Sequence, residues 1–158
     1  MIIVIKKTIK TIEHSYPYRR NSVCAMSSII KRISLRVPSD VIYRGLKDTR
    51  LEQLFPEFFT GVTRRLTNSN DETNSELEFT TITYDSQIQI KEIFKLEVLQ
   101  SNATEISYTT NINIANDPVV ESIVYTHIAN ILFSLLMLET GYVNGLMEKH
   151  ENVNYEAK

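Results

Sequence analysis

Residues 117–149 read DPVVESIVYTHIANILFSLLMLETGYVNGLMEK, and this stretch decides the fold. It has no proline after Pro118, so it predicts one long helix with Asp117 as its cap and Pro118 at the first helical position, where a missing N–H costs little. Its apolar residues cover well over half of the helix circumference. A helix this apolar must be covered on more than one side. One sheet supplies one cover, and a ligand, a partner subunit or the N-terminal segment must supply the rest.

Four runs of strand-forming residues precede this helix and are divided by turn-forming clusters; they span residues 58–66, 77–84, 88–99 and 105–114. Connections this short favour antiparallel hairpins over crossovers. The third run alternates most clearly, since one parity holds Ile88, Ile90, Phe94, Leu96 and Val98, and the other holds Gln89, Lys91, Lys95 and Glu97. This alternation predicts half-buried strands.

Another strand and two short helices come before these runs. Residues 29–37 alternate in the same way, and Pro38 ends the strand. Pro38, Ser39 and Asp40 supply oxygens that can cap a helix, which stops near Asp48. A second helical turn spans residues 50–55, because Pro56 disfavours helical geometry in the residue before it.

This element order resembles the START-like superfamily, also known as the helix-grip, pollen-allergen-like or SRPBCC superfamily. VPSDVIYRGLKD (residues 37–48) is similar to its strand, small residues and helix ending in Leu-x-Asp, and LEQLFP (51–56) is similar to its second short helix, which ends in an aromatic-proline pair. The resemblance covers roughly residues 27–149, and small archaeal START-like proteins are the most similar group. It implies an α+β helix-grip fold in which a curved antiparallel sheet wraps on the long C-terminal helix. The common family sheet has seven strands, whereas five are counted here, so the pocket is expected to be smaller or more open.

The chain divides into three parts. Residues 1–25 form a basic, loosely ordered leader, residues 26–150 form the helix-grip domain, and residues 151–158 form a C-terminal tail. One hypothesis makes Met26 the true start, which the intact mass of natively expressed protein would test. The rival hypothesis is that residues 2–5, IIVI, add an edge strand, which would bring the sheet to six.

Composition narrows the classes of function. The formal net charge is −2 and the body is acidic, which argues against nucleic-acid binding. Cys24 is the single cysteine, so no disulfide can form within the chain. At the N-terminus the apolar residues come before the lysines, whereas a secretory signal has its basic residues first. We therefore expect a cytoplasmic protein. Residues 128–138 fall short of the ~20 needed to cross a bilayer, so no stable membrane insertion is expected. The scattered histidines and ungrouped glycines predict no metal and no cofactor.

Glu92 is the most informative single residue, because it shares the parity of the apolar side chains around it. A buried carboxylate must find a partner or have a raised pKa, since desolvation disfavours its charged form. One interpretation is a polar anchor or general acid/base in a pocket. The other is that the strand bulges or twists there, or that an arginine such as Arg32 or Arg64 pairs with it near the rim.

The predicted pocket is apolar with a few polar groups. Tyr108 and His127 are the other polar candidates, although a core tyrosine or a satisfied core histidine is the alternative interpretation of each. Arg32, Arg36, Arg64 or Arg65 could pair with a fatty-acid carboxylate at the mouth. The predicted ligand-binding residues are Val62, Leu77, Phe79, Ile90, Glu92, Phe94, Leu96, Tyr108, Ile112, His127, Ile128, Ile131 and Leu135.

Three functions follow from these expectations. The leading one is a carrier or sensor that binds a fatty-acid-like or other hydrophobic small molecule, without catalysis. The second is a START-like enzyme of the cyclase or dehydratase type, with Glu92, Tyr108 or His127 as acid/base; the fold alone does not exclude it. The third is a homodimeric interaction module that uses the apolar face of the C-terminal helix.

Overall fold

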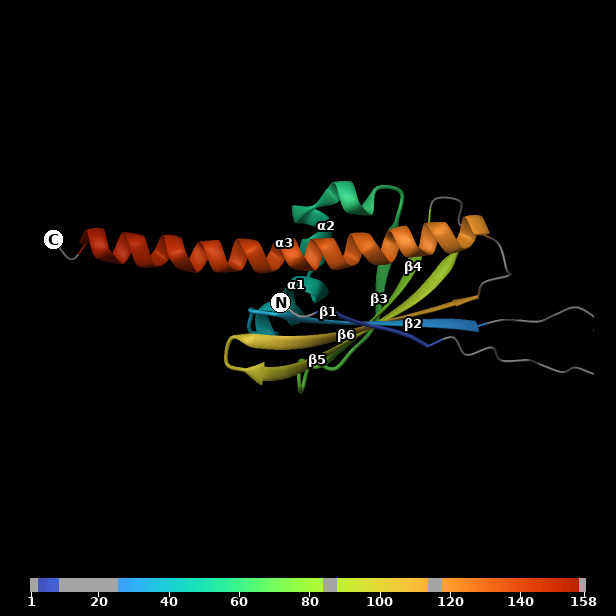
Figure 1. Ribbon diagram of the computed structural model, residues 1–158, viewed down its shortest axis with the longest axis horizontal. Coiled ribbons are helices and arrows are strands. Elements are labelled where there is room, and N and C mark those ends of the chain that lie inside the picture. The colour runs from blue at the N-terminus through green and yellow to red at the C-terminus, as the bar shows by residue number, and fades with distance from the viewer. Residues whose placement is uncertain (1–2, 9–25, 84–87, 114–117, 157–158) are drawn as a thin grey trace, which may run out of the picture.

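The computed structural model describes residues 3–8, 26–83, 88–113 and 118–156; of residues 3–8, 26–27, 113 and 146–156 it describes the backbone alone. It contains one antiparallel six-stranded sheet in the order β1-β2-β6-β5-β4-β3, with a long helix along it (Figure 1). The strands are β1 Ile3–Thr8, β2 Met26–Leu35, β3 Thr63–Ser69, β4 Glu76–Ile82, β5 Gln89–Gln100 and β6 Ala103–Asn113. The helices are α1 Ser39–Lys47, α2 Arg50–Leu54, the 3-10 turn η1 Pro56–Phe59 and α3 Pro118–Glu156.

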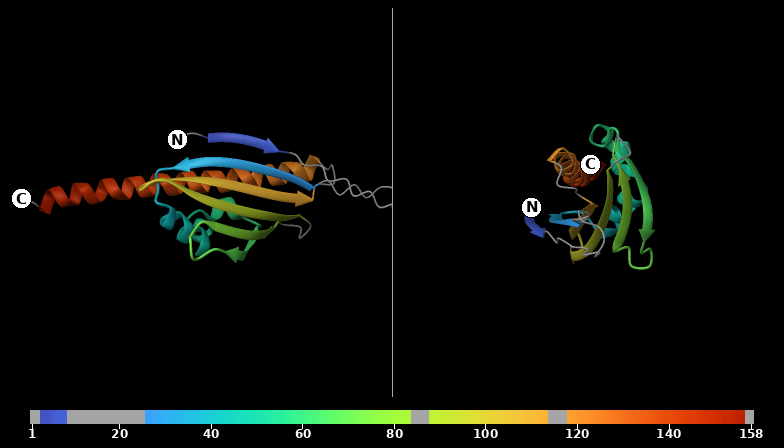
Figure 2. Two further views of the ribbon diagram at one scale, coloured as in Figure 1. Left: turned by 90° about the horizontal axis from the view of Figure 1, so that it is seen from below. Right: turned by 90° about the vertical axis from the view of Figure 1, so that its right-hand side faces the viewer.

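The sheet is curved, and α3 lies within its bend, as the end-on view in Figure 2 shows. The two short helices follow β2, and α2 and η1 lie on the same side of the sheet as α3. The predicted helix-grip architecture is therefore confirmed, with six strands, the upper of the two predicted numbers.

β1 is the edge strand that the rival hypothesis for the N-terminus predicted. Its backbone pairs antiparallel with β2, with Ile3 opposite Ile33 and Thr8 opposite Ser28. The β-branched residues at its start are well suited to a strand. Residues 3–8 thus belong to the sheet and not to a loose leader, while residues 9–25, including Cys24, lie outside the described part of the chain.

The alternation predicted for β5 is present over most of the strand. Its inward side chains are Ile90, Glu92, Phe94 and Leu96, preceded by Ile88, and all of them are buried. Val98 was predicted on the same side, but it is 60% exposed. Val98 still pairs in register with Thr104, and it lies near the end of β5, just before the register between β5 and β6 shifts.

The first predicted hairpin strand, residues 58–66, is wrong in its first half. Pro56–Phe59 forms η1, whose Phe59 is buried, and β3 begins only at Thr63. Gly61 lies between them with a φ of 70°, a left-handed conformation that glycine adopts without strain. This turn places η1 against α3 instead of in the sheet.

The helix starts differ partly from prediction. No side chain caps α1; the N–H groups of Val41 and Ile42 donate to the carbonyl of Pro38 instead. α2 ends at Leu54, close to its predicted limit. α3 begins at Pro118, as predicted, while Asp117 lies outside the described residues.

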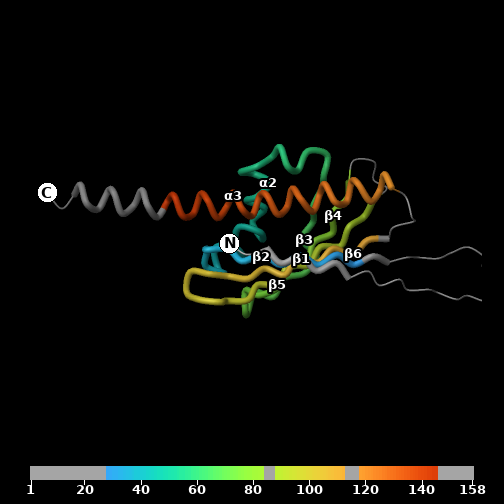
Figure 3. Tube along the Cα trace, viewed as in Figure 1, coloured from blue at the N-terminus to red at the C-terminus, as the bar shows by residue number. Residues whose placement is uncertain are grey.

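α3 is longer than predicted, since it continues through residues 151–156, which were predicted to form a tail. Its core face consists of Val124, Ile128, Ile131 and Leu135, and Figure 3 traces it without a break along the sheet between residues 118 and 145. By length and composition alone, Pro118–Gly145 is apolar enough to cross a membrane, a longer apolar stretch than residues 128–138 indicated. The core helix of a globular domain meets the same criterion, and one face of α3 is buried against the sheet.

One buried carboxylate ties α3 to the loop after β2. Glu139 is nearly buried, and its Oε2 accepts a hydrogen bond of 2.6 Å from the backbone N–H of Arg36. We expect Glu139→Ala to lower the free energy of unfolding by about 1–3 kcal/mol, because the N–H loses its partner. Urea denaturation would measure this loss.

Arg36→Ala is the matched control. The Arg36 side chain is largely exposed and lies 4.0 Å from the carboxylate, so the backbone hydrogen bond survives its removal. We expect a change within about 0.5 kcal/mol. Equal losses in the two variants would contradict the assignment of the stabilising contact to the backbone N–H.

Candidate functional site

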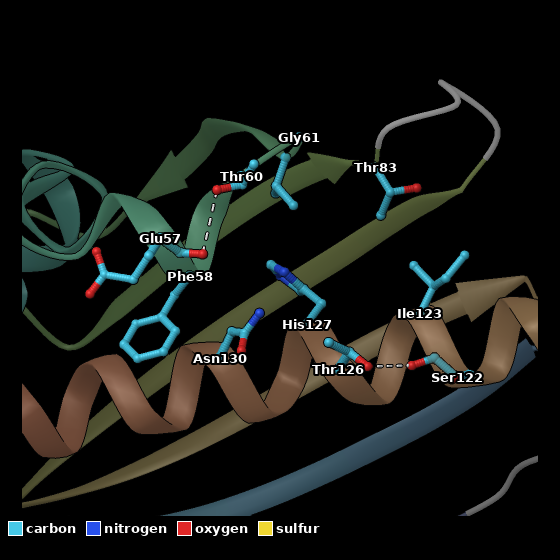
Figure 4. A pocket seen from close by; sticks show the side chains of 11 residues that line it. Glu57, Phe58, Thr60, Gly61, Thr83, Ser122, Ile123, Thr126, His127 and Asn130 are labelled. Atoms are coloured by element: carbon cyan, nitrogen blue, oxygen red, sulfur yellow. Dashed lines mark hydrogen bonds between the residues drawn. The ribbon is translucent and has the colours of Figure 1, made fainter.

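A pocket of about 270 Å³ opens between the first half of α3, η1 and the ends of β3 and β4. Figure 4 shows its side chains, with His127 projecting from α3 toward the segment that carries Thr60 and Gly61. The lining residues are Glu57, Phe58, Thr60, Gly61, Val62, Thr83, Ser122, Ile123, Thr126, His127 and Asn130.

The lining combines apolar walls with neutral polar groups. Phe58, Val62 and Ile123 supply apolar surface. Thr126 donates its hydroxyl hydrogen to the backbone carbonyl of Ser122, so this hydrogen is not free to bond to a ligand. Glu57 is acidic, and no lysine or arginine is among the described residues of the lining. The pocket is therefore suited to a molecule that is largely apolar and carries no negative charge.

A buried polar cluster lies behind His127 and is centred on Glu92, which is completely buried. Its Oε2 accepts hydrogen bonds from Arg64 Nε at 3.0 Å and from the Thr81 hydroxyl. Its Oε1 accepts from the Tyr108 hydroxyl and pairs with His127 Nε2 at 2.8 Å. Both carboxylate oxygens thus have two partners each, which matches the number of lone pairs they offer.

Arg64 supplies the positive charge of this cluster. Its side chain is only 2% exposed, and besides Glu92 it pairs through Nη1 with Glu52 of α2. Its guanidinium also stacks over Phe79, 4.4 Å from the ring centroid. Cation–π contact and two carboxylates together compensate for the desolvation of the guanidinium. The predicted pairing of an arginine with Glu92 is confirmed for Arg64, but the pair is buried and not at a rim; Arg32 is exposed.

The cluster shifts the pKa values of its members in opposite directions. Burial would raise the pKa of Glu92, but the charge of Arg64 and the bonds from His127 and Thr81 outweigh it and hold this pKa well below 4.5. Burial raises the pKa of Tyr108 well above 10.0, and the adjacent Glu92 charge adds to the effect. Glu92 is therefore a fixed carboxylate and Tyr108 a neutral phenol at neutral pH.

His127 connects this cluster to the pocket. Because a carboxylate only accepts, the ring nitrogen Nε2 carries a hydrogen, and Nδ1 of the neutral ring is then an acceptor. Nδ1 is buried and has no hydrogen-bond partner among the described residues. The prediction of a fully satisfied core histidine is thus correct for one nitrogen and wrong for the other.

The structure separates the predicted site residues into two groups. Val62 and His127 line the pocket, and Glu92 and Tyr108 lie directly behind His127. The others belong to the buried core and do not line this pocket: Leu77, Phe79, Ile90, Phe94, Leu96, Ile112, Ile128, Ile131 and Leu135. Arg32, Arg36, Arg64 and Arg65, predicted near a ligand carboxylate, do not line it either.

Several pocket residues escaped prediction. Ser122, Thr126 and Asn130 are spaced by four on α3, and this polar line on an apolar helix was the available signal. Phe58 and Thr60 were assigned to the strand predicted for residues 58–66, and no pattern pointed to them or to Glu57 as pocket residues. Thr81 and Glu52 complete the cluster through contacts that no local periodicity indicates.

A second depression, of about 290 Å³, lies between α1, α2 and α3. It is lined by Val41, Arg44, Gly45, Arg50, Leu54 and Leu138. Arg44 already pairs with Asp40 at 2.9 Å. None of its described side chains has a buried polar atom without a partner, so the His127 pocket is the stronger candidate.

The low pKa of Glu92 predicts a pH dependence of stability. The folded carboxylate stays ionised where the unfolded one, with an ordinary pKa near 4.5, takes up a proton. The contribution is thus present above about pH 5 and is lost as the pH falls. We expect the free energy of unfolding to fall less steeply between about pH 5 and pH 3 in Glu92→Gln than in the wild type. Urea denaturation at several pH values measures this slope; equal slopes would contradict the assignment.

Comparisons with known proteins place the fold. No protein-family model and no curated protein matches the sequence. Among solved structures, CalU16 from Micromonospora echinospora has a TM-score of 0.59 at 9% identity, with 97% of this chain and 96% of that chain covered. An HSP90 activator from Plasmodium falciparum has a TM-score of 0.56 at 14% identity (70% and 94% covered). Norcoclaurine synthase from Thalictrum flavum has 0.52 at 13% identity (74% and 96% covered).

These identities are low, so the similarity concerns the backbone arrangement. The shared features are the curved antiparallel sheet, the short helices after its first long strand and the C-terminal helix. The chain has the helix-grip fold, and its structural neighbours are START-like and Bet v 1-like proteins.

Proposed function

We propose that this protein binds a hydrophobic small molecule in the pocket beside His127, as a carrier or sensor. The observation that carries the proposal is the buried, unpartnered Nδ1 of His127 in a pocket with apolar walls. Burying a polar atom without a partner costs about 1–3 kcal/mol, and a bound ligand could recover that cost. The norcoclaurine synthase structure holds a transition-state analogue, which supports the proposal that this fold accommodates a small molecule.

The pocket volume bounds the ligand size. About 270 Å³ equals roughly nine water volumes at about 30 Å³ each. A ligand of about ten non-hydrogen atoms would fill it, so a fatty-acid-like ligand would insert only part of a long chain. Each buried methylene contributes about 0.8 kcal/mol to the binding free energy. Because so small a molecule buries few such groups, and the costs of association are subtracted from their sum, we expect weak binding.

Propylbenzene is a suitable first probe, because it fits the volume and carries no polar group. We expect its titration to shift the amide NMR signals of residues around the pocket, such as Val62 and Ile123, with saturation. Native mass spectrometry of protein purified without detergent, followed by organic extraction, would identify a natural ligand. Unshifted pocket signals at the solubility limit of propylbenzene would contradict the proposal.

A second candidate function is acid/base catalysis on the bound molecule. It is favoured by the hydrogen bond between Glu92 and His127, which fixes the ring of a residue that lines the pocket and leaves Nδ1 without a partner among the described residues. Glu92 and Tyr108 are less suited to proton transfer, since one is held ionised and the other protonated. An apolar extract of the cells that make the protein, incubated with wild type or His127→Gln, tests this. A product formed only by the wild type would support an enzyme, and identical extracts would contradict it.

The outward face of α3 supports a third proposal, a homodimer. Phe133 and Met137 are 56% and 43% exposed, and both lie one turn apart on the same side of the helix. Covering such side chains removes apolar surface from water. Sedimentation in dilute solution should then show a dimer that Phe133→Ser dissociates; a strict monomer would contradict it.

A cytoplasmic location and a closer similarity to small archaeal START-like proteins remain predictions.

A further inference from the structure

His127, which lines the pocket, carries one buried nitrogen without a partner among the described residues, and this feature selects among hydrophobic ligands. We propose that the ligand is a neutral molecule with a hydroxyl or N–H group that donates a hydrogen bond to Nδ1 of His127, and not a carboxylate. The inference rests on the proposed function, since it specifies the ligand of the same pocket.

The acceptor role of Nδ1 follows from the surroundings of Glu92. Arg64 Nε and the hydroxyls of Thr81 and Tyr108 donate to this carboxylate, so it has no hydrogen to give. The remaining partner, His127 Nε2, lies 2.8 Å from Oε1 and must supply its own hydrogen. In the neutral form of the ring, Nδ1 therefore offers a lone pair.

The described residues leave this lone pair without a partner, on a side chain that lines the pocket. Nδ1 is buried from solvent and bonds to no described residue, while the ring lines the cavity. Figure 4 shows the ring between α3 and the turn at Thr60 and Gly61, with Asn130 one turn further along the helix. A donor on the ligand would satisfy the acceptor, whereas a purely apolar ligand would leave it unpaired.

The charges around the pocket disfavour an anionic head group. Among the described residues that line the pocket, Glu57 carries the charge, and this charge is negative. Arg64 does not line the pocket, and its charge is already shared by Glu52 and Glu92. A carboxylate beside His127 would thus enter a site with no cation of its own, and burying an unpaired charge is costly.

Three matched probes test the proposal on the wild-type protein: propylbenzene, 4-propylphenol and 4-propylbenzoate. We expect the phenol to bind about fivefold or more tightly than propylbenzene, and the benzoate at neutral pH to bind more weakly than the phenol. If propylbenzene binds but the phenol shows no gain, or if the benzoate binds most tightly, the inference is overturned while the proposed function stands. If none of the three binds, the proposed function itself fails.

His127→Gln separates the acceptor from the rest of the site. Its amide N–H₂ can still donate to Glu92, but it places no acceptor where Nδ1 lies. We expect the ratio of the phenol affinity to the propylbenzene affinity to fall to about one in this variant, whatever the change in propylbenzene binding itself. A retained preference would overturn the inference.

A direct measurement needs no variant. In protein with ¹⁵N-labelled histidine, the two-bond proton–nitrogen spectrum identifies the tautomer, and we expect hydrogen on Nε2 of His127. Addition of 4-propylphenol should move the Nδ1 resonance in the direction of a hydrogen-bonded acceptor, and propylbenzene should not. A hydrogen on Nδ1 of the neutral ring, or equal shifts with both probes, would overturn the proposal.

Discussion

Arg64→Met is expected to lower the free energy of unfolding by about 3–5 kcal/mol, one of the two largest effects we predict for this protein. Methionine keeps much of the side-chain length and the contact with Phe79, so the loss is mainly that of the charge. Without Arg64, the completely buried Glu92 and the partly buried Glu52 have no cation. Urea denaturation at neutral pH measures the loss.

Arg65→Met is the matched control, because Arg65 is the next residue of the same strand and is exposed. We expect it to change the stability by no more than about 0.5 kcal/mol. The double variant Arg64→Met, Glu92→Gln should lose clearly less free energy of unfolding than the sum of the losses of the two single variants. Each single change leaves a buried charge without its partner, whereas the double change removes both charges. Additive losses, or a loss under about 1 kcal/mol for Arg64→Met, would contradict a buried ion pair that depends on both partners.

Asn130→Trp is expected to abolish binding of the apolar probe, with a loss of affinity of more than about tenfold. Asn130 lies on α3, is half-buried and lines the pocket, so an indole in its place occupies the volume that a ligand needs. Titration with propylbenzene, followed by amide NMR shifts, measures the loss.

Asn144→Trp provides the control for this experiment. Asn144 is exposed on the same helix and does not line the pocket, so the same substitution should leave the affinity unchanged within about twofold. Thermal denaturation of both variants shows whether the fold is kept. Unchanged binding by a folded Asn130→Trp variant would mean that the ligand lies elsewhere.

Much of the fold was predictable because its signals are local. The alternation around Ile90 and Phe94 fixed which side of β5 is buried, and the same parity placed Glu92 inside. Pro56 was correctly predicted to end the helix before it. The strand predicted for residues 58–66 began too early because a run of apolar residues also suits a buried 3-10 turn such as η1.

The pocket was much less predictable. Most of the residues predicted to line it pack in the core, because parity distinguishes inside from outside but not a filled interior from a cavity. The actual lining comes from η1, the turn at Gly61 and the polar line on α3, three segments that meet only after folding.

The sequence by itself determined the order of the elements, the buried sides of the strands and the presence of a carboxylate among apolar side chains, because each depends on neighbours within a few residues. Only the tertiary structure decided the chemistry of that carboxylate. Glu52, Arg64, Thr81, Tyr108 and His127 reach the Glu92 cluster from five other elements, and their sequence separations follow no period. Their convergence holds Glu92 ionised and leaves Nδ1 of His127 buried without a partner among the described residues, since charge pairing and hydrogen bonding depend on distance in space.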